Sequence, residues 1–433
     1  MSAAVPKDQL LVQIASYNTA LQGSTGLPQD LVDWLSPTLQ VSSFLSHSPR
    51  GPDIVAVGFQ ELLPLHLGLS GASKSVIDKR SSHILSQIEA NSPDKAKYSL
   101  LANIVNVGVA LLVYARDEGV ARKVRNVQTS WTGCGPGYMG NKGAVGVRFR
   151  VSDDDEQPGE TYTFVCAHLT AHQEKLQHRI ADFHHIVGTL LFPPLPFSED
   201  NSPTTIYSTS HLFFLGDLNF RIDLPKSHPM FEDPWAHVSE ALRKPETRET
   251  LKEFDQLLME RRKRSVFVGF REGEFWQFKC TYKHSLSAVD QYDAKRIPAW
   301  TDRIMYTTYS DPVDNLEISR IRNLLYTYIP SYTISDHKPI VSLLLLPPPP
   351  LTSVSTSQHT RRIPTIFLPE YYAPKPDPLA TLKRYTGRTL DRIVGVCWWL
   401  FTLFGAGSAV VGIFNFFVGV TAYRWWRTSR SSV

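Results

Sequence analysis

The segment Gly216–Asp217–Leu218–Asn219 carries two side chains that could act on one water molecule. It follows the apolar run 211–215, which has the pattern of a β-strand. If the strand continues, Asp217 and Asn219 share one face, where a carboxylate and an amide can hold and deprotonate a water. Taken alone, such a segment is more often a simple turn.

Histidines and further carboxylates lie beside other apolar runs. His168 directly follows the run 162–167, and Asp336 and His337 precede the last run, 340–346. Glu61 comes after the run 53–59 and offers the hard oxygen ligand that magnesium prefers. A lone histidine is usually structural or a surface residue, so each of these signals is weak by itself.

The elements that must position these residues are short strands separated by helical stretches. Between about residues 8 and 346, the apolar runs are 53–59, 105–114, 144–149, 162–167, 211–215 and 340–346. This alternation is typical of an α/β domain with a strand-rich core. We expect the ends of these strands to gather at one sheet edge and to form a site there.

The order of these segments from Asn18 to His337 resembles the deoxyribonuclease/endonuclease/phosphatase superfamily. Two long phrases, FLGDLNFR at 214–221 and RIPAWTDRI at 296–304, are similar to the signature motifs of the inositol polyphosphate 5-phosphatases. The resemblance implies a two-sheet α/β sandwich flanked by helices. It also implies an enzyme that removes the 5-phosphate of phosphatidylinositol 4,5-bisphosphate and related inositol phosphates.

The resemblance further implies a role for each residue of the metal and water sites. Glu61 would bind Mg²⁺ with help from Asn18. Asp217 would activate the attacking water, and Asn219 would orient it for in-line attack. Phosphoryl transfer needs mainly positioning and electrostatic stabilisation, which these groups can supply without a covalent intermediate.

A second implied set of residues stabilises the phosphoryl group. His337, positioned by Asp302, would stabilise the charge on this group. His168 would act from another side, and Asp336 would support the site. The resemblance assigns no residue to the protonation of the leaving group.

Cationic side chains would select the substrate by binding a second phosphate on the inositol ring. Tyr282, Lys283 and Arg296 match family positions that bind the 4-phosphate, and Lys142 lies on a glycine-rich loop near the ring. Many members of the family carry a lysine where this chain has alanine at position 294. Lys295 is expected to replace that lysine imperfectly.

Composition excludes some classes of protein. Of the 433 residues, 42% are hydrophobic and 20% are charged, so the chain can bury a core. The net charge of +4 is not the domain-wide basic excess of a nucleic-acid-binding protein, and we expect no nucleic-acid partner. The four widely spaced cysteines suit a reducing compartment, so a cytosolic catalytic domain is expected.

The C-terminal part differs in composition from the rest of the chain. Four prolines at 347–350 end the expected catalytic domain, residues 8–346, and residues 347–392 are expected to form a proline-rich tether. Residues 393–423 contain no charged residue, and one membrane crossing needs ~20 apolar residues. We therefore expect a single transmembrane helix over 393–423, followed by a short basic tail over 424–433.

This reading predicts a tail-anchored membrane protein with a cytosolic catalytic domain, and the endoplasmic reticulum is the expected membrane. Two alternatives remain for residues 393–423. One is a buried core helix, and the other is a re-entrant hairpin bent at glycines such as Gly405 and Gly412.

Competing functions are also open. A nuclease of the same superfamily would share the glutamate, aspartate and histidine chemistry, but the phrase at 296–304 and the apolar C-terminal segment argue against it. A catalytically inactive membrane-tethered scaffold would be expected to lack Glu61, Asp217, Asn219 or His337, and all four are present. A sphingomyelinase-like phosphodiesterase has a substrate without ring phosphates for the lysines and Arg296 to bind.

Overall fold

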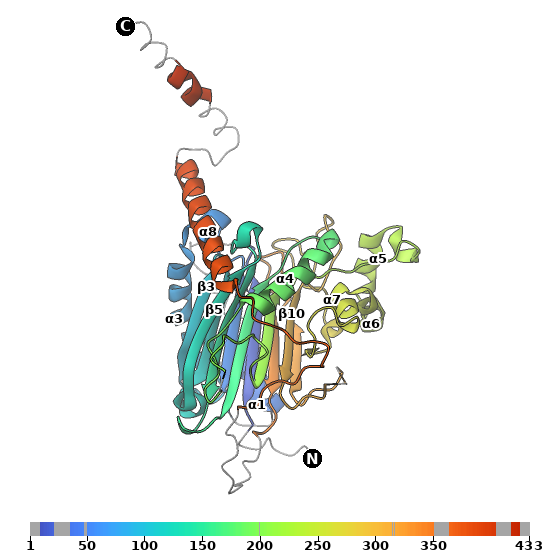
Figure 1. Cartoon of the computed structure of the whole chain (residues 1–433). Helices are drawn as coiled ribbons and strands as arrows, with labels where there is room; N and C mark the ends of the chain where they lie inside the picture. The colour runs from blue at the N-terminus through green and yellow to red at the C-terminus, as the bar shows by residue number, and fades with distance from the viewer. Residues whose placement is uncertain are drawn as a thin grey trace, which may run out of the picture.

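The computed structural model of this chain describes residues 9–20, 35–46, 50–198, 200–313, 315, 317–349, 363–403 and 417–424. Two β-sheets pack face to face at its centre (Figure 1). Sheet A contains β1 (Leu11–Asn18), β2 (Ile54–Gln60), β3 (Tyr98–Asn106), β4 (Val109–Arg116), β11 (Arg322–Tyr328) and β12 (Ile340–Leu345). Sheet B contains β5 (Val124–Gly133), β6 (Gly143–Val151), β7 (Glu160–His168), β8 (His211–Asp217), β9 (Arg271–Glu272) and β10 (Asp302–Thr308).

The helices of the described residues surround this sandwich. They are α1 (Ser36–Ser46), α2 (Leu65–Ser70), α3 (Ser73–Asn91), α4 (Leu176–Thr189), α5 (Pro234–Ala241), α6 (Pro245–Leu251), α7 (Gln256–Arg262) and α8 (Ala380–Leu403). The strand order is β11-β12-β1-β2-β4-β3 in sheet A and β5-β6-β7-β8-β10-β9 in sheet B. The predicted two-sheet α/β sandwich is confirmed.

The main core lies between the two sheets, where side chains such as Ile14, Val113, Phe164 and Phe213 are fully buried. The strands read as continuous apolar runs because helices cover their other faces as well. Helix α3 covers sheet A through residues such as Ile84, whereas α4 covers sheet B through other apolar side chains.

The strand pairing brings the chemically active ends together. β1 and β2 are parallel, and so are β7 and β8, so Asn18, Gln60, His168 and Asp217 end their strands at one edge of the sandwich. β10 runs antiparallel to β8 and begins at this edge, with Asp302 opposite Asp217. The predicted gathering of strand ends at one edge is therefore present.

The run 105–114 differs from the sequence-based expectation of one strand. It contains the hairpin turn at Val107 and Gly108, which joins the end of β3 to β4. Val107 adopts a positive φ of 54° in this turn. Asn106 and Gly108 interrupt the apolar run at this point, and both residue types favour turns.

The tether expected over 347–392 is largely wrong for its described part. Residues 363–379 pack on the sandwich: the Ile366 N–H donates to the Thr209 carbonyl at 2.9 Å, and the Asp377 N–H donates to the Gly188 carbonyl at 2.8 Å. Helix α8 begins at Ala380 rather than at residue 393. The buried Ile366 side chain among the prolines supplies an apolar contact that a free tether would not have.

The predicted membrane helix is described only in part. Helix α8 includes residues 393–403, residues 417–424 are helical, and 404–416 lie outside the described residues. Within the described part of the chain, no helix combines the length and the apolarity that a membrane crossing requires. The single span over 393–423 stays a prediction.

Candidate active site

Asp217 ends β8 and lies at the centre of the clustered strand ends, only 1% exposed. Asn18 Nδ2 donates to Asp217 Oδ2 at 2.9 Å, and His168 Nε2 lies 3.3 Å from the same oxygen. Burial alone would raise the pKa of Asp217, but His337, His168 and Lys142 hold it well below its usual range. The carboxyl group is therefore ionised at neutral pH.

Asn219 does not share a strand face with Asp217, which differs from the sequence-based expectation. The strand ends at Asp217, and Asn219 has a positive φ of 58°, which asparagine tolerates better than most residues. The Asn219 N–H donates to Asp217 Oδ1 at 3.1 Å, and its Nδ2 donates to the Leu169 carbonyl at 3.2 Å. Asn219 thus contacts the Asp217 carboxylate through its backbone.

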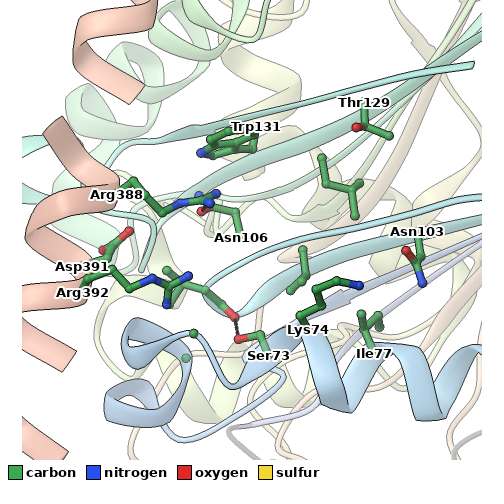
Figure 2. A pocket seen from close by; sticks show the side chains of 15 residues that line it. Ser73, Lys74, Ile77, Asn103, Asn106, Thr129, Trp131, Arg388, Asp391 and Arg392 are labelled. Atoms are coloured by element: carbon green, nitrogen blue, oxygen red, sulfur yellow. Dashed lines mark hydrogen bonds between the residues drawn. The ribbon is translucent and has the colours of Figure 1, made fainter. Parts of the chain in front are cut away.

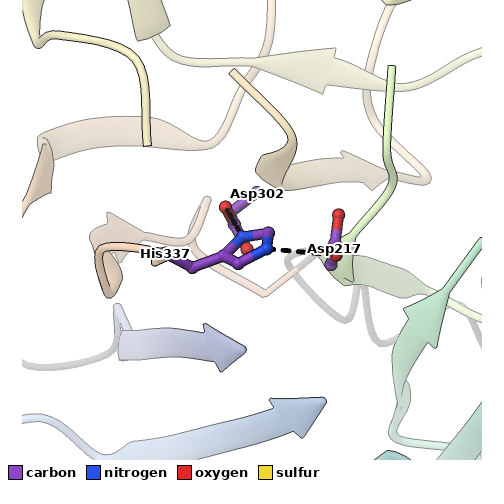
Figure 3. Close-up of side chains that lie close together, drawn as sticks. All are labelled: Asp217, Asp302 and His337. Atoms are coloured by element: carbon purple, nitrogen blue, oxygen red, sulfur yellow. Dashed lines mark hydrogen bonds and ion pairs between the residues drawn. The ribbon is translucent and has the colours of Figure 1, made fainter. Parts of the chain in front are cut away.

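His337 lies between two carboxylates (Figure 3). Its Nδ1 is 2.9 Å from Asp302 Oδ2, and its Nε2 is 3.9 Å from Asp217 Oδ2. The hydroxyls of Thr281 and Thr301 donate to the same Asp302 oxygen at 2.7 and 2.9 Å. These bonds fix Asp302, which in turn fixes the orientation of the imidazole.

The charge of His337 follows from this arrangement. Burial alone would lower its pKa, but Asp302 and Asp217 raise the pKa of His337 to about 9. At neutral pH the ring is therefore an imidazolium. The 3.9 Å between Nε2 and Asp217 is too long for a hydrogen bond, so the Nε2–H can be directed at a bound anion.

Lys142 enters the site from the loop that precedes β6. Its Nζ contacts His168 Nε2. Burial lowers the pKa of Lys142, although the carboxylates of Asp217 and Glu61 act in the opposite direction. Lys142 thus lies near Asp217, and it also belongs to the loop that the sequence predicts to contact substrate.

The oxygen ligands at this edge fit a divalent cation. Glu61 follows β2 with a positive φ of 51°, and its Oε1 lies 3.9 Å from His168 Nε2. The carboxylate oxygens of Glu61 and Asp217 are hard donors, which suit magnesium or calcium. Asn18 turns its Nδ2 toward Asp217, and its Oδ1 accepts the Ala20 N–H at 3.0 Å.

Asp217, Asp302 and His337 form a second group of possible metal ligands. Within the described residues, ligand atoms of Asp217, Asp302 and His337 lie within 4.8 Å of one another. In this set the His337 ring already pairs with Asp302 through Nδ1, at 2.9 Å, whereas magnesium prefers oxygen ligands. The donor chemistry therefore favours the side of Asp217 that faces Glu61.

The loop at 281–284 packs against the segment that carries His337. Lys283 Nζ donates to Asp336 Oδ2 at 2.5 Å, and the His284 N–H donates to the Asp336 carbonyl at 2.8 Å. The rings of Tyr282 and His337 are 4.5 Å apart. Asp336 therefore connects this loop to the active histidine.

A polar pocket adjoins this loop. Its lining includes Tyr282, Arg221, Arg296 and His172. Lys295 and Arg296, which the sequence predicts to bind substrate, are both exposed, and only Arg296 lines this pocket. The structure thus places Arg296 in the pocket with Tyr282 and leaves Lys295 out of the pocket lining.

Arg221 has a place in the site that the sequence reasoning did not identify. Its guanidinium contacts Asn219 Oδ1 and lies 4.4 Å from the centre of the Tyr282 ring. It therefore links the turn after β8 to the substrate loop. The only sequence signal was its position at the end of the phrase 214–221.

The comparisons with known proteins cover this same region. Residues 15–343 match the family described as Endonuclease/Exonuclease/phosphatase family 2. Rat synaptojanin-2 is 32% identical over 352 residues, which are 76% of this chain and 21% of that protein. Mouse type II inositol 1,4,5-trisphosphate 5-phosphatase is also 32% identical, over 72% of this chain and 28% of that protein. The chain thus spans only a fifth to about a quarter of the length of these relatives.

Solved structures agree with this similarity. The inositol polyphosphate 5-phosphatase domain of SpSynaptojanin, in complex with inositol (1,4)-bisphosphate and a calcium ion, is 26% identical with a TM-score of 0.58. That match covers 78% of this chain and 84% of the other. A Cimex nitrophorin has the same fold at 20% identity and a TM-score of 0.54. Function must therefore be argued from the residues of the site.

Proposed function

This chain belongs to the endonuclease/exonuclease/phosphatase family, and from that premise we propose that it is an inositol polyphosphate 5-phosphatase. The observation that carries the proposal is the group Asp302, His337 and Asp217 at the clustered strand ends, beside the pocket lined by Arg296. The similarity to the SpSynaptojanin domain, which was crystallised with an inositol bisphosphate, supports the same substrate class.

Each residue of the site has a separate role in the proposed hydrolysis. The ionised Asp217 accepts a proton from the attacking water, which it holds for in-line attack with help from the turn at Asn219. The imidazolium of His337 donates its Nε2–H to a phosphoryl oxygen, and Asp302 keeps it charged and oriented. Lys142 places further positive charge near Asp217, and His168 Nε2 lies 3.3 Å from the same carboxylate.

We infer that a magnesium ion assists this reaction. Glu61 and Asp217 would hold it through carboxylate oxygens, and Asn18, whose Nδ2 donates to Asp217, would help to position that carboxylate. When bound, the ion supplies charge neutralisation for the phosphate oxygens and lowers the pKa of a bound water. The calcium ion in the SpSynaptojanin complex supports a divalent metal in this fold.

The ring of the substrate fits the polar pocket beside the site. Tyr282 and Arg296 line this pocket, so they are the proposed contacts for a second phosphate. Lys283 is paired with Asp336, and a substrate phosphate would compete for the same ammonium group. Lys295 is close in sequence and remains a secondary candidate.

We propose that the substrate is a membrane phosphoinositide, and that residues 393–423 attach the chain to the membrane. The apolar side chains Trp398, Trp399 and Phe401 are 44, 42 and 65% exposed at the end of α8. Trp398 lies beside His66 of α2, which follows Glu61 in the chain. The apolar segment therefore begins on the same edge as the site, which favours a lipid substrate in the membrane to which the chain is attached.

Phosphate release from phosphatidylinositol 4,5-bisphosphate vesicles with magnesium tests the proposed activity. Asp217→Asn should lower kcat by roughly 10²–10⁴-fold, because a base of this kind contributes about that much. Removal of magnesium by a chelator should abolish release. The absence of release by the wild type, or full activity of Asp217→Asn, contradicts the proposal.

A further inference from the structure

Helix α8 contacts the loop that carries Lys142 at several points along one face. Lys383 lies 5.5 Å from the Tyr138 ring centre. One turn later, a Cβ atom on Gly387 would lie 1.8 Å from the Tyr138 carbonyl oxygen, so α8 and the loop touch through their backbones. Another turn later, both carboxylate oxygens of Asp391 accept the Gly140 N–H, at 3.0 and 3.1 Å.

Asp391 is placed as a structural anchor rather than as a surface charge. It is 2% exposed, and Figure 2 shows it between Arg388 and Arg392 on the face of α8 that is turned toward the sandwich. Burial raises the pKa of Asp391 to about 6, while the Gly140 N–H and the two arginines act in the opposite direction. A buried carboxylate is costly unless hydrogen bonds satisfy it, and the Gly140 N–H supplies such a bond.

The same helix holds the segment that follows Glu61. Arg392 donates to the Leu69 carbonyl of α2 at 2.9 Å. A Cβ atom on Gly395 would lie 2.3 Å from the Ser70 nitrogen, so the backbones are again in close contact. The buried positions Gly387, Asp391 and Gly395 are four residues apart and therefore form one stripe on α8.

These contacts lead directly to the chemistry. Gly140 is two residues from Lys142, whose Nζ contacts His168, and His168 lies 3.3 Å from Asp217. The loop is also closed on itself, since the Cys134 N–H donates to the Lys142 carbonyl at 2.8 Å. A shift of Gly140 would therefore move Lys142 relative to Asp217.

We propose that Asp391 is a positioning residue for catalysis, through which α8 holds the Lys142 loop in its active geometry. The proposal rests on the proposed phosphatase function. In this proposal, helix α8, which leads to the apolar C-terminal segment, is required for full catalytic activity. The loop that carries Lys142 is then held by a helix outside the sandwich.

The test uses the full chain in detergent with a water-soluble inositol polyphosphate, so that membrane attachment does not influence the rate. Asp391→Ala and Gly387→Leu should each lower kcat by ~10-fold or more, because small misplacements of catalytic groups are costly. Thr386→Leu introduces the same side chain at an exposed neighbouring position and should leave kcat unchanged. Equal activity of wild type and Asp391→Ala would overturn the proposal.

A double mutant separates positioning from general destabilisation. If Asp391 acts through Lys142, then Asp391→Ala should have no further effect on kcat in a Lys142→Met background. Multiplicative losses would show that Asp391 does not act through Lys142. Amide hydrogen exchange provides a readout without catalysis: exchange over residues 138–142 should accelerate at least tenfold in Asp391→Ala, and unchanged exchange overturns the proposal.

The failure of this proposal can be distinguished from the failure of the proposed function. An inactive wild type contradicts the phosphatase function. An active wild type whose rate is insensitive to Asp391→Ala contradicts only the role of Asp391.

Discussion

At the scale of single residues, the charge of His337 is the feature with the clearest functional consequence. Its pKa of about 9 depends on Asp302, which the hydroxyls of Thr281 and Thr301 hold in place. A histidine with its ordinary pKa near 6.5 would be mostly neutral at physiological pH. The Asp302 carboxylate thus keeps His337 protonated at physiological pH, as the proposed reaction requires.

The pH dependence of activity should report this proton. In the wild type, kcat/KM is expected to fall as pH rises through about 9, because His337 then loses its charge. In Asp302→Asn, the fall should occur at lower pH. The measurement is a pH–rate profile with a soluble inositol polyphosphate, and identical alkaline limbs in the two proteins would contradict the assignment.

The same proton affects stability. Because the folded-state pKa of His337 is raised, its stabilising contribution is complete below the unfolded value near 6.5 and is lost as pH rises through about 9.

Two adjacent cations in the turn before β10 should differ in their effect on substrate binding. Arg296 lines the polar pocket, whereas Lys295 does not. Arg296→Gln should raise KM for a bisphosphorylated substrate by roughly 10–100-fold, the effect of losing a hydrogen bond to a charged group. Lys295→Gln is the matched control with a small effect. If the two substitutions raise KM equally, then Arg296 does not bind substrate more strongly than Lys295 does, and the pocket is not the binding site for the second phosphate.

At the scale of elements, the turn from β8 into the site depends on Gly216. Its φ is 138°, and a Cβ atom there would lie 2.0 Å from the Ala167 carbonyl oxygen of the neighbouring strand β7. Close packing of β7 on β8 therefore requires glycine at this position. The same closeness brings His168 and Asp217 together at the strand ends.

Gly216→Ala should destabilise the fold by roughly 2 kcal/mol or more and reduce activity, since backbone strain and the contact with Ala167 act together. Gly119→Ala is the matched control, because Gly119 has a φ of 153° but a Cβ atom there would meet no atom within 4 Å. Thermal unfolding of both variants measures the difference. A fall in Tm no larger for Gly216→Ala than for Gly119→Ala would contradict the role of the β7 contact.

At the scale of the whole molecule, the catalytic domain and the C-terminal segment are connected by a docked helix. The contacts of α8 continue to Gly395 and Trp398, so a truncation at residue 392 would remove part of the packing on α2. A cut after Leu403 keeps these contacts. Figure 1 shows α8 extending beyond the end of the sandwich.

Deletion of residues 404–433 should release the protein from membranes while it keeps its activity on soluble inositol polyphosphates. The physical reason is that the apolar segment, rather than the sandwich, is the proposed attachment. Carbonate-washed membranes and a phosphate-release assay make the two measurements. A truncated protein that still sediments with washed membranes would contradict attachment through this segment.

The apolar runs predicted an α/β domain and placed Asp217, His168 and His337 near strand ends, because such runs are local patterns, and the family resemblance implied the two-sheet sandwich. The sequence did not predict that β8 stops at Asp217, since the turn of Asn219 depends on contacts with Leu169 and the neighbouring strand. Nor could it separate Lys295 from Arg296, because the packing of the turn decides which of these two exposed side chains lines the pocket.

The sequence by itself determined the family of the chain, the catalytic and binding side chains that the site could use, and the apolar character of residues 393–423. Only the tertiary structure decided that residues 363–379 and the first part of α8 pack on the domain and that Asp391 accepts the Gly140 N–H. The physical reason is distance along the chain. Asp391 and Gly140 are brought together by the packing of α8, and no local pattern in either segment records that contact.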